Sequence, residues 1–226
     1  MRTSREGDHR AERRSDARRN GERILDAAFA VFARSGVDAQ MSDIAEAAGV
    51  GVATLYRNFP TKEAIVHALV LDRLVRCTAV ANDAAGDDDP WRALVQCCRF
   101  ITDLQLENLV LAQFLSRRIT GSPELLDQRD AMYEVIDGIV HRAQAAGQLR
   151  PDANVSDVRM ALVAFAQVSG HESQIAQRLV RRYVGIVMDG LRGPGREVLG
   201  GPPLTIEESE DAFALRGRQP NAAESR

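Results

Sequence analysis

Apolar residues recur every three to four positions along most of the chain, which is the spacing of an amphipathic helix. The first clear stripe consists of Leu25, Ala28, Phe29 and Phe32, and it ends at Ser35-Gly36, where glycine permits a left-handed helix end. No segment alternates between apolar and polar residues for long enough to predict a strand. The pattern therefore predicts an all-α protein.

Capping residues, glycines and prolines divide the rest of the chain into further helices. The expected caps are Ser42, Asp89, Ser122 and Asn154. The long helix that begins at Lys62 is expected to bury Ile65, Leu69, Leu71 and Val75. The expected helices, about nine in all, cover residues 18–35, 42–48, 52–58, 62–84, 91–119 (as one or two helices), 122–146, 154–169 and 174–191.

Both ends of the chain lack this periodicity. Residues 1–18 are polar and arginine-rich, and we expect a flexible arm; residues 193–226 are rich in glycine and proline and then polar, and we expect a flexible tail. The first 23 residues carry eight arginines and five acidic residues, although the formal net charge of the chain is −3. Any binding of nucleic acid must therefore rely on a local basic surface.

The composition favours a cytoplasmic protein. No apolar run approaches the roughly 20 residues that span a bilayer, and the first residues lack the apolar stretch of a signal peptide. The three cysteines, Cys77, Cys97 and Cys98, are an odd number and closely spaced, so free thiols are expected rather than disulfides.

Residues 42–59 have the composition of two short helices joined by a glycine turn, a helix-turn-helix. Gly49 permits positive φ in the turn, and Val50, Leu55 and Phe59 are expected to pack inward. The outward face of the second helix then presents side chains suited to a DNA groove: Val52, Ala53, Thr54, Tyr56 and Arg57.

The spacing of Gly49-Val50, Thr54-Leu55-Tyr56, Phe59 and Lys62 resembles the DNA-binding domain of TetR-family transcriptional regulators. The resemblance implies a three-helix DNA-binding domain over residues 19–64 and a helical ligand-binding and dimerisation domain over residues 65–192. It also implies a homodimeric, sequence-specific regulator of transcription. The expected mechanism is repression, relieved when a small-molecule ligand releases the dimer from a palindromic operator.

The resemblance also assigns DNA contacts. Lys62, the only lysine in the chain, matches a lysine that opens the fourth helix, where an ammonium group can anchor a phosphate. The alternatives are a solvated surface lysine and, for the whole motif, a helical hairpin that packs on a protein partner. Asn58 and Met41 depart from the residues common in the family, so phosphate contacts can differ in detail. The implied DNA-binding residues are Ser42, Val52, Ala53, Thr54, Tyr56, Arg57 and Lys62.

A mostly apolar ligand pocket is implied among the central helices of the C-terminal domain, although such positions are more often plain core. The candidates are Trp91, Phe100, Gln105, Phe114, Met132, Tyr133 and Phe165. Two subunits are expected to pair through residues 155–169 and 174–191, at Leu162, Phe165, Leu179, Tyr183 and Ile186. A two-fold dimer would place its two recognition helices, residues 52–58 of each subunit, about 34–36 Å apart or somewhat more, and a ligand that shifts helix 62–84 would change this spacing.

One alternative from another class stays open, a helical protein that senses a ligand or thiol oxidation and binds DNA only incidentally. The three cysteines are candidates for such a sensor, although buried cysteine is usually a small hydrophobic residue. His141 and His171 lack the partners of a metal site, and no catalytic triad or carboxylate pair is visible. We therefore expect no enzyme activity, no metal and no cofactor. The sequence identifies neither the effector nor the operator and target genes.

Overall fold

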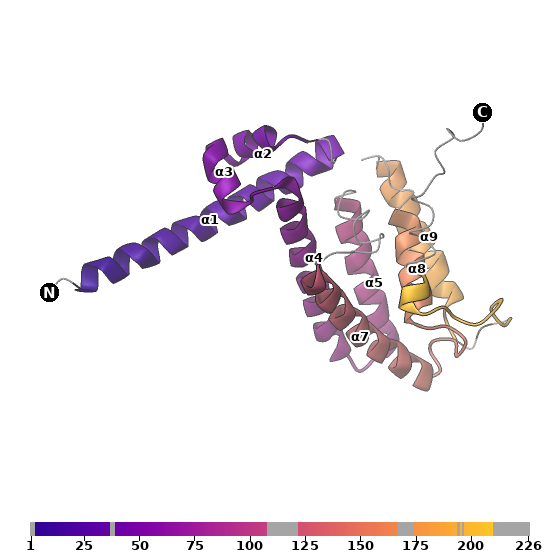
Figure 1. The fold of residues 1–226 in the computed structure, drawn as a ribbon. Coiled ribbons are helices and arrows are strands. Elements are labelled where there is room, and N and C mark those ends of the chain that lie inside the picture. Colours follow the sequence, from indigo (N-terminus) through magenta and orange to yellow (C-terminus); the bar gives the residue numbers. More distant parts are fainter. Residues whose placement is uncertain are drawn as a thin grey trace, which may run out of the picture. The chain divides into compact units, whose positions relative to one another are not determined.

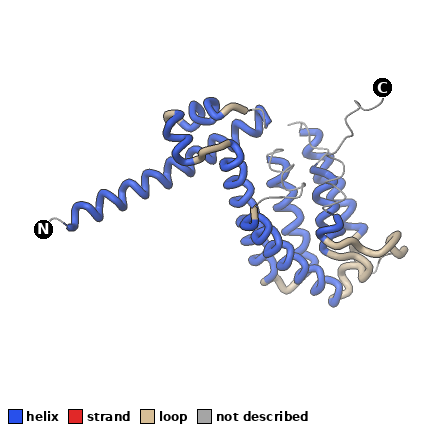
Figure 2. Tube along the Cα trace, viewed as in Figure 1, coloured by secondary structure: helices blue, strands red, loops and turns tan. Residues whose placement is uncertain are grey.

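The computed structural model describes residues 3–36, 39–107, 122–166, 174–193, 195 and 197–209. Figure 2 shows helix and loop, and no strand, across these described ranges. The predicted all-α fold is therefore confirmed. The helices labelled in Figure 1 are α1 (Thr3–Ser35), α2 (Met41–Ala48), α3 (Val52–Asn58), α4 (Lys62–Ala85), α5 (Pro90–Glu107), α7 (Pro123–Ala145), α8 (Val155–Ala166) and α9 (Gln174–Gly190).

The chain divides into two compact units, Met1–Leu69 and Val70–Arg226. Helix α4 begins in the first unit and continues into the second, so the two units share one helix. The boundary that we predicted after residue 64 also falls within α4. Helix α4 is therefore a continuous covalent link between the two units.

In the first unit, α1, α2 and α3 pack around a shared core, and Figure 1 shows α2 and α3 beside the C-terminal half of α1. Ile24, Ala28 and Phe32 of α1 are at most 2% exposed, whereas Leu25 and Phe29 lie at the edge of the buried stripe. Burial of a large apolar side chain stabilises a fold by about 1.5–3 kcal/mol. This core fixes the orientation of α3.

Helix α1 begins earlier than the sequence pattern predicts. We expected it to start near Arg18, after a flexible arm, but it starts at Thr3. Residues 3–17 contain one glycine and no proline, and they are rich in arginine, glutamate and alanine, which favour helix. A segment without an apolar face gives no periodic signal, and for this reason the pattern missed it.

In the second unit, the predicted caps begin the helices. Asp89 Oδ1 accepts a hydrogen bond from the backbone N–H of Trp91 at 3.0 Å, and Asn154 Oδ1 accepts one from that of Ser156 at 2.9 Å. Ser122 caps α7 in the same way. These caps satisfy backbone donors that have no partner within their own helices.

The buried face of α4 differs from the predicted one in its second half. Val75, which we expected to be buried, is 47% exposed, whereas Leu74 and Cys77 are buried. The buried positions continue the helical spacing that begins at Val70, and Leu71 lies only at the edge of this face. The prediction is confirmed for Ile65 and Leu69, which are buried, and is wrong for Val75.

Residues 197–209, which we call the C-terminal segment, differ from the flexible tail that we expected. The backbone N–H of Leu199 donates to Asp152 Oδ2 at 2.8 Å, and Asn154 Nδ2 donates to the carbonyl oxygen of Leu204 at 2.9 Å. The segment is thus held mainly through its backbone, by side chains about fifty positions earlier. Sequence periodicity carries no signal for such contacts.

Candidate DNA-binding surface and effector cavity

The turn between α2 and α3 depends on a glycine and on an arginine from α1. Gly49 has φ +61°, the left-handed region, and the N–H of Val50 donates to the carbonyl oxygen of Ala45 at 3.0 Å. Arg23 Nη2 donates to the carbonyl oxygen of Ala48 at 2.7 Å, which ties α1 to the turn. The predicted positive φ of Gly49 is confirmed. The support from Arg23 was not predicted because it links residues far apart in the chain.

Helix α3 has one buried face and one exposed face. Leu55 is fully buried at 0% exposure, while Val52 and Tyr56 are 48% and 47% exposed. Ala53 and Arg57 are also exposed. The outward face of α3 therefore presents Val52, Ala53, Tyr56 and Arg57, while their contacts with DNA stay a prediction.

Two polar side chains organise the exposed face. Arg57 Nη2 donates to Thr54 Oγ1 at 2.9 Å, so the guanidinium lies against the half-buried threonine. Asn58 Nδ2 donates to the carbonyl oxygen of Thr54 at 2.8 Å. The amide of Asn58 is thus engaged within α3 itself.

Ser42 and Lys62 lie in the first turns of α2 and α4. The prediction that Ser42 caps α2 is wrong, because α2 begins at Met41 after the cap residue Gln40. The N–H of Gln40 donates to Asp43 Oδ2 at 3.1 Å, and Ser42 is exposed in the first turn. Lys62 is the first residue of α4 and is half-buried.

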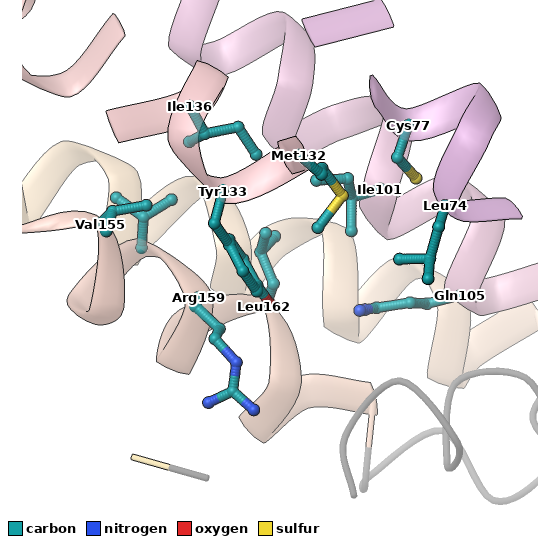
Figure 3. Close-up of a pocket in the computed structure, with 11 residues that line it drawn as sticks. Leu74, Cys77, Ile101, Gln105, Met132, Tyr133, Ile136, Val155, Arg159 and Leu162 are labelled. Atoms are coloured by element: carbon teal, nitrogen blue, oxygen red, sulfur yellow. The ribbon is translucent and has the colours of Figure 1, made fainter. Parts of the chain in front are cut away.

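A small cavity of about 30 Å³ lies among α4, α5, α7 and α8 (Figure 3). This volume holds about one water molecule, so a larger ligand requires the walls to move. In the view of Figure 3, Leu74, Cys77 and Gln105 line one side, and Tyr133 and Arg159 the other. The lining residues are Leu74, Cys77, Ile101, Gln105, Met132, Tyr133, Ile136, Val155, Val158, Arg159 and Leu162.

The cavity brings together three of the predicted ligand residues, Gln105, Met132 and Tyr133. Trp91 instead lines a separate hollow between α5 and α9, where the guanidinium of Arg192 lies 5.1 Å from its ring. Phe100 is half-buried, with the guanidinium of Arg76 at 6.0 Å from its ring centre.

Two further ligand candidates cannot be placed. Phe114 lies outside the described residues, as does the side chain of Phe165.

Sequence reasoning missed Arg159, which is 2% exposed and lines the cavity. Arg159 lies three residues before Leu162 on a largely apolar helix, so the two share a face. A charged residue on the apolar face of a helix was the signal that could have identified it.

The predicted dimer residues do not all share one face. Leu179, Tyr183 and Ile186 of α9 are 41%, 44% and 53% exposed, whereas Val180, Val184 and Met188 of the same helix are buried. Leu162 is only 6% exposed and lines the cavity, so in this structure it belongs to the interior.

The cysteines are buried free thiols. Burial raises the pKa of Cys77 and Cys98 to about 12 and that of Cys97 to about 11. The thiolate is the reactive form, so these cysteines are protonated and shielded near neutral pH. Their environment is that of core residues and weighs against a thiol sensor.

Two family profiles match the chain. Residues 24–69 match bacterial regulatory proteins of the tetR family, and residues 89–193 match the C-terminal domain of SbtR-like transcriptional regulators. Both profiles belong to transcriptional regulators rather than enzymes.

In the parts of the chain that the structure describes, no helix is long and apolar enough to cross a membrane.

Similar proteins agree with these profiles. The HTH-type transcriptional repressor KstR of Mycobacterium tuberculosis is 27% identical over 180 residues, 74% of this chain and 82% of that protein. A TetR transcriptional regulator from Streptomyces coelicolor is 32% identical with a TM-score of 0.58, covering 76% of this chain and 98% of that one. A TetR transcription regulatory protein from Mycobacterium vanbaalenii is 31% identical with a TM-score of 0.55, covering 79% and 98%. The chain therefore belongs to the TetR family of DNA-binding transcriptional regulators.

Proposed function

We propose that two copies of this chain bind a palindromic operator through α3 and repress transcription until a small molecule occupies the cavity. The exposed face of α3 carries the proposal, because Val52 and Tyr56 are about half exposed on a helix that Gly49 and Arg23 hold in place. Solvent-facing apolar and aromatic side chains beside an arginine suit the major groove.

Each side chain of this face has a DNA group that suits it. Arg57 has donors for guanine or a phosphate, Val52 and Ala53 suit thymine methyl groups, and Thr54 and Tyr56 have hydroxyls for phosphate oxygens. Ser42 and Lys62, at the starts of α2 and α4, would contact the backbone on either side. Base contacts then set the sequence that is read, and phosphate contacts set the register.

The exposed stripe of α9 supports pairing of two subunits. Leu179, Tyr183 and Ile186 are all more than 40% exposed and lie on one side of the helix. An exposed apolar stripe of this kind suits a two-fold interface, in which each subunit presents the same surface. The contributions of Leu162 and Phe165 stay a prediction, and the buried position of Leu162 argues against its own.

The cavity supports an effector that acts through α4. Leu74 and Cys77 line the cavity, while Lys62 begins the same helix among the proposed DNA contacts. A ligand that enlarges the small cavity would displace α4 and change the distance between the α3 helices of the two subunits. Repression is the favoured direction because the similar KstR proteins are named repressors.

The experiment is a binding titration of the full chain with its own upstream DNA against competitor DNA, at about 50 to 200 mM salt. We expect a specific complex that survives at the higher salt, and Tyr56→Ala and Lys62→Ala should weaken it. Arg34→Ala, which removes a charge from the exposed last turn of α1, is the control. Binding that disappears at modest salt and ignores Tyr56→Ala would contradict the proposal.

A further inference from the structure

Gln105 places a buried amide in the wall of the cavity. It is 6% exposed, and it shares this wall with apolar residues such as Leu74, Ile101 and Met132. An amide has two N–H donors and a carbonyl acceptor, and its burial costs free energy unless these groups have partners. The partners of the Gln105 amide therefore indicate what the cavity can hold.

The amide of Gln105 forms no hydrogen bond with any residue that the structure describes. The other two polar residues of the wall differ from it. Arg159 Nη1 donates to Ser209 Oγ at 2.7 Å, and Tyr133 also has a partner. Within the described chain, Gln105 is thus the polar lining residue whose donors and acceptor are unused.

The side chain of Gln105 also points into the cavity. In Figure 3 it extends from the side of Leu74 toward Tyr133 and Leu162, and its nitrogen lies at the inner end. Gln105 belongs to α5, and Leu74 beside it belongs to α4. A molecule in the cavity would therefore meet this amide next to α4.

We propose that the cavity takes an uncharged, mostly apolar molecule whose one polar head group both donates and accepts hydrogen bonds, and that Gln105 binds this head group. This inference rests on the proposed function, in which the cavity is the effector site. Because the cavity is only about 30 Å³, its walls must move apart to take the apolar part of the molecule.

A carboxamide illustrates the match. Its N–H can donate to the carbonyl oxygen of Gln105 while its own carbonyl oxygen accepts from the Gln105 amide. An ionised carboxylate accepts hydrogen bonds but cannot donate, so it would leave the Gln105 carbonyl oxygen without a donor. Gln105 would therefore select an uncharged head group over an anionic one.

The test uses the full-length chain with octanamide and octanoate, two probes that have the same carbon chain and differ in the head group. Both are kept below the concentrations at which they form micelles. Near neutral pH, calorimetry should show octanamide binding at least about tenfold more tightly, because an unmade hydrogen bond of a buried group costs about this factor in affinity. Equal affinities, a preference for octanoate, or no binding of octanamide would overturn the inference.

Gln105→Leu removes the amide at a similar side-chain volume. The affinity for octanamide should fall about tenfold, whereas the affinity for octanoate should change much less. The melting temperature of the free chain should rise by a few degrees, because leucine replaces a buried amide whose hydrogen bonds are unmade. A residue that serves only the fold would show a lower melting temperature. That result, or an unchanged affinity for octanamide, would contradict the proposed role of Gln105.

Thr102→Val is the matched control on the same helix. Thr102 is 3% exposed and is not among the lining residues, and its hydroxyl donates to the carbonyl oxygen of Cys98 at 2.7 Å. Its replacement should leave the affinity for octanamide unchanged and should not raise the melting temperature. Equal changes in the two variants would contradict a specific role of the Gln105 amide. If Gln105→Leu does not fold, the comparison of the two probes with wild type still decides.

Operator affinity, measured in the same samples, separates this inference from the proposed function. Tight binding of octanamide that depends on Gln105, but with unchanged DNA binding, would support the inference and contradict the effector role of the cavity. Loss of DNA binding with octanoate as readily as with octanamide would support the effector role and overturn the inference.

Discussion

In the first unit the residues proposed to contact DNA lie on α3 and at the starts of α2 and α4, and most of them are exposed, whereas in the second unit the cavity residues come from four helices and are mostly buried. The exposed α3 residues Val52, Tyr56 and Arg57 add little to the core, so their chemistry is free to serve recognition. The cavity residues are also the core of the second unit. Substitutions at the proposed DNA contacts should therefore leave the fold stable, whereas substitutions at the apolar cavity residues should also destabilise it.

The largest expected effect comes from disrupting the proposed dimer, which would hold two α3 helices against one operator. Leu179→Asp places a charge in the exposed stripe of α9 and should give a monomer with at least about 100-fold weaker operator binding, because each half-site then binds alone. Sedimentation analysis and DNA titration measure the two effects. Val75→Asp, at a helical residue of similar exposure (47% against 41%), is the control. A Leu179→Asp chain that stays dimeric would exclude this interface.

The second-largest expected effect is on operator affinity when the proposed base contact of Arg57 is removed. Arg57→Ala should weaken operator binding about 10- to 100-fold, the value of a good arginine–base pair, and should leave the melting temperature unchanged because Arg57 is exposed. Fluorescence anisotropy and thermal melting provide the two readouts. Arg34→Ala removes an equal charge elsewhere and should have a much smaller effect. Equal losses in the two variants would mean that charge, and not the face of α3, governs binding.

Gly49→Ala tests how firmly α3 is held. Alanine is strained at φ +61°, and its Cβ would lie 3.1 Å from Arg23 Nη2, so the free energy of unfolding should fall by about 1–3 kcal/mol. Gly51→Ala is the matched control, since φ there is −66° and nothing lies within 4 Å of the added carbon. Urea denaturation compares them. The same cost at both glycines would remove the argument for a fixed turn.

The smallest expected effect is a pH dependence of the C-terminal segment. Hydrogen bonds from Arg150 and from the N–H of Leu199 lower the pKa of Asp152 below its ordinary value. The folded pKa is the lower one, so the stabilising contribution is complete above the unfolded pKa, about 3.9, and is lost as the pH falls through the folded pKa. Hydrogen exchange at Leu199 should be constant from neutral pH to about pH 5 and should accelerate below about pH 4, relative to the intrinsic rate. Asp152→Asn should remove this dependence.

The sequence predicted the first unit better than the second for a physical reason. The turn at Gly49, the burial of Leu55 and the exposure of Val52 are all set by neighbours within a few residues. The cavity depends on residues from 74 to 162, and the attachment of Ser209 to Arg159 joins residues 50 apart. Local periodicity cannot report such contacts.

Two further differences from the prediction show what an apolar stripe reports and what it does not. The early start of α1 was hidden because a polar helix has no apolar stripe. Leu162 was assigned to the dimer because an apolar residue on a helix does not reveal which neighbour buries it. The pattern gives the helix and its apolar face, and only the packed structure gives the partner.

Selection of bound duplexes from a random pool, with wild type and Arg57→Ala side by side, tests whether α3 reads the operator. We expect wild type to enrich a palindrome, and Arg57→Ala to lose preference at one symmetric pair of base positions while keeping the rest. An unchanged preference in the variant would assign Arg57 to a phosphate instead of a base. Enrichment of no sequence by wild type would contradict the claim that α3 reads the operator.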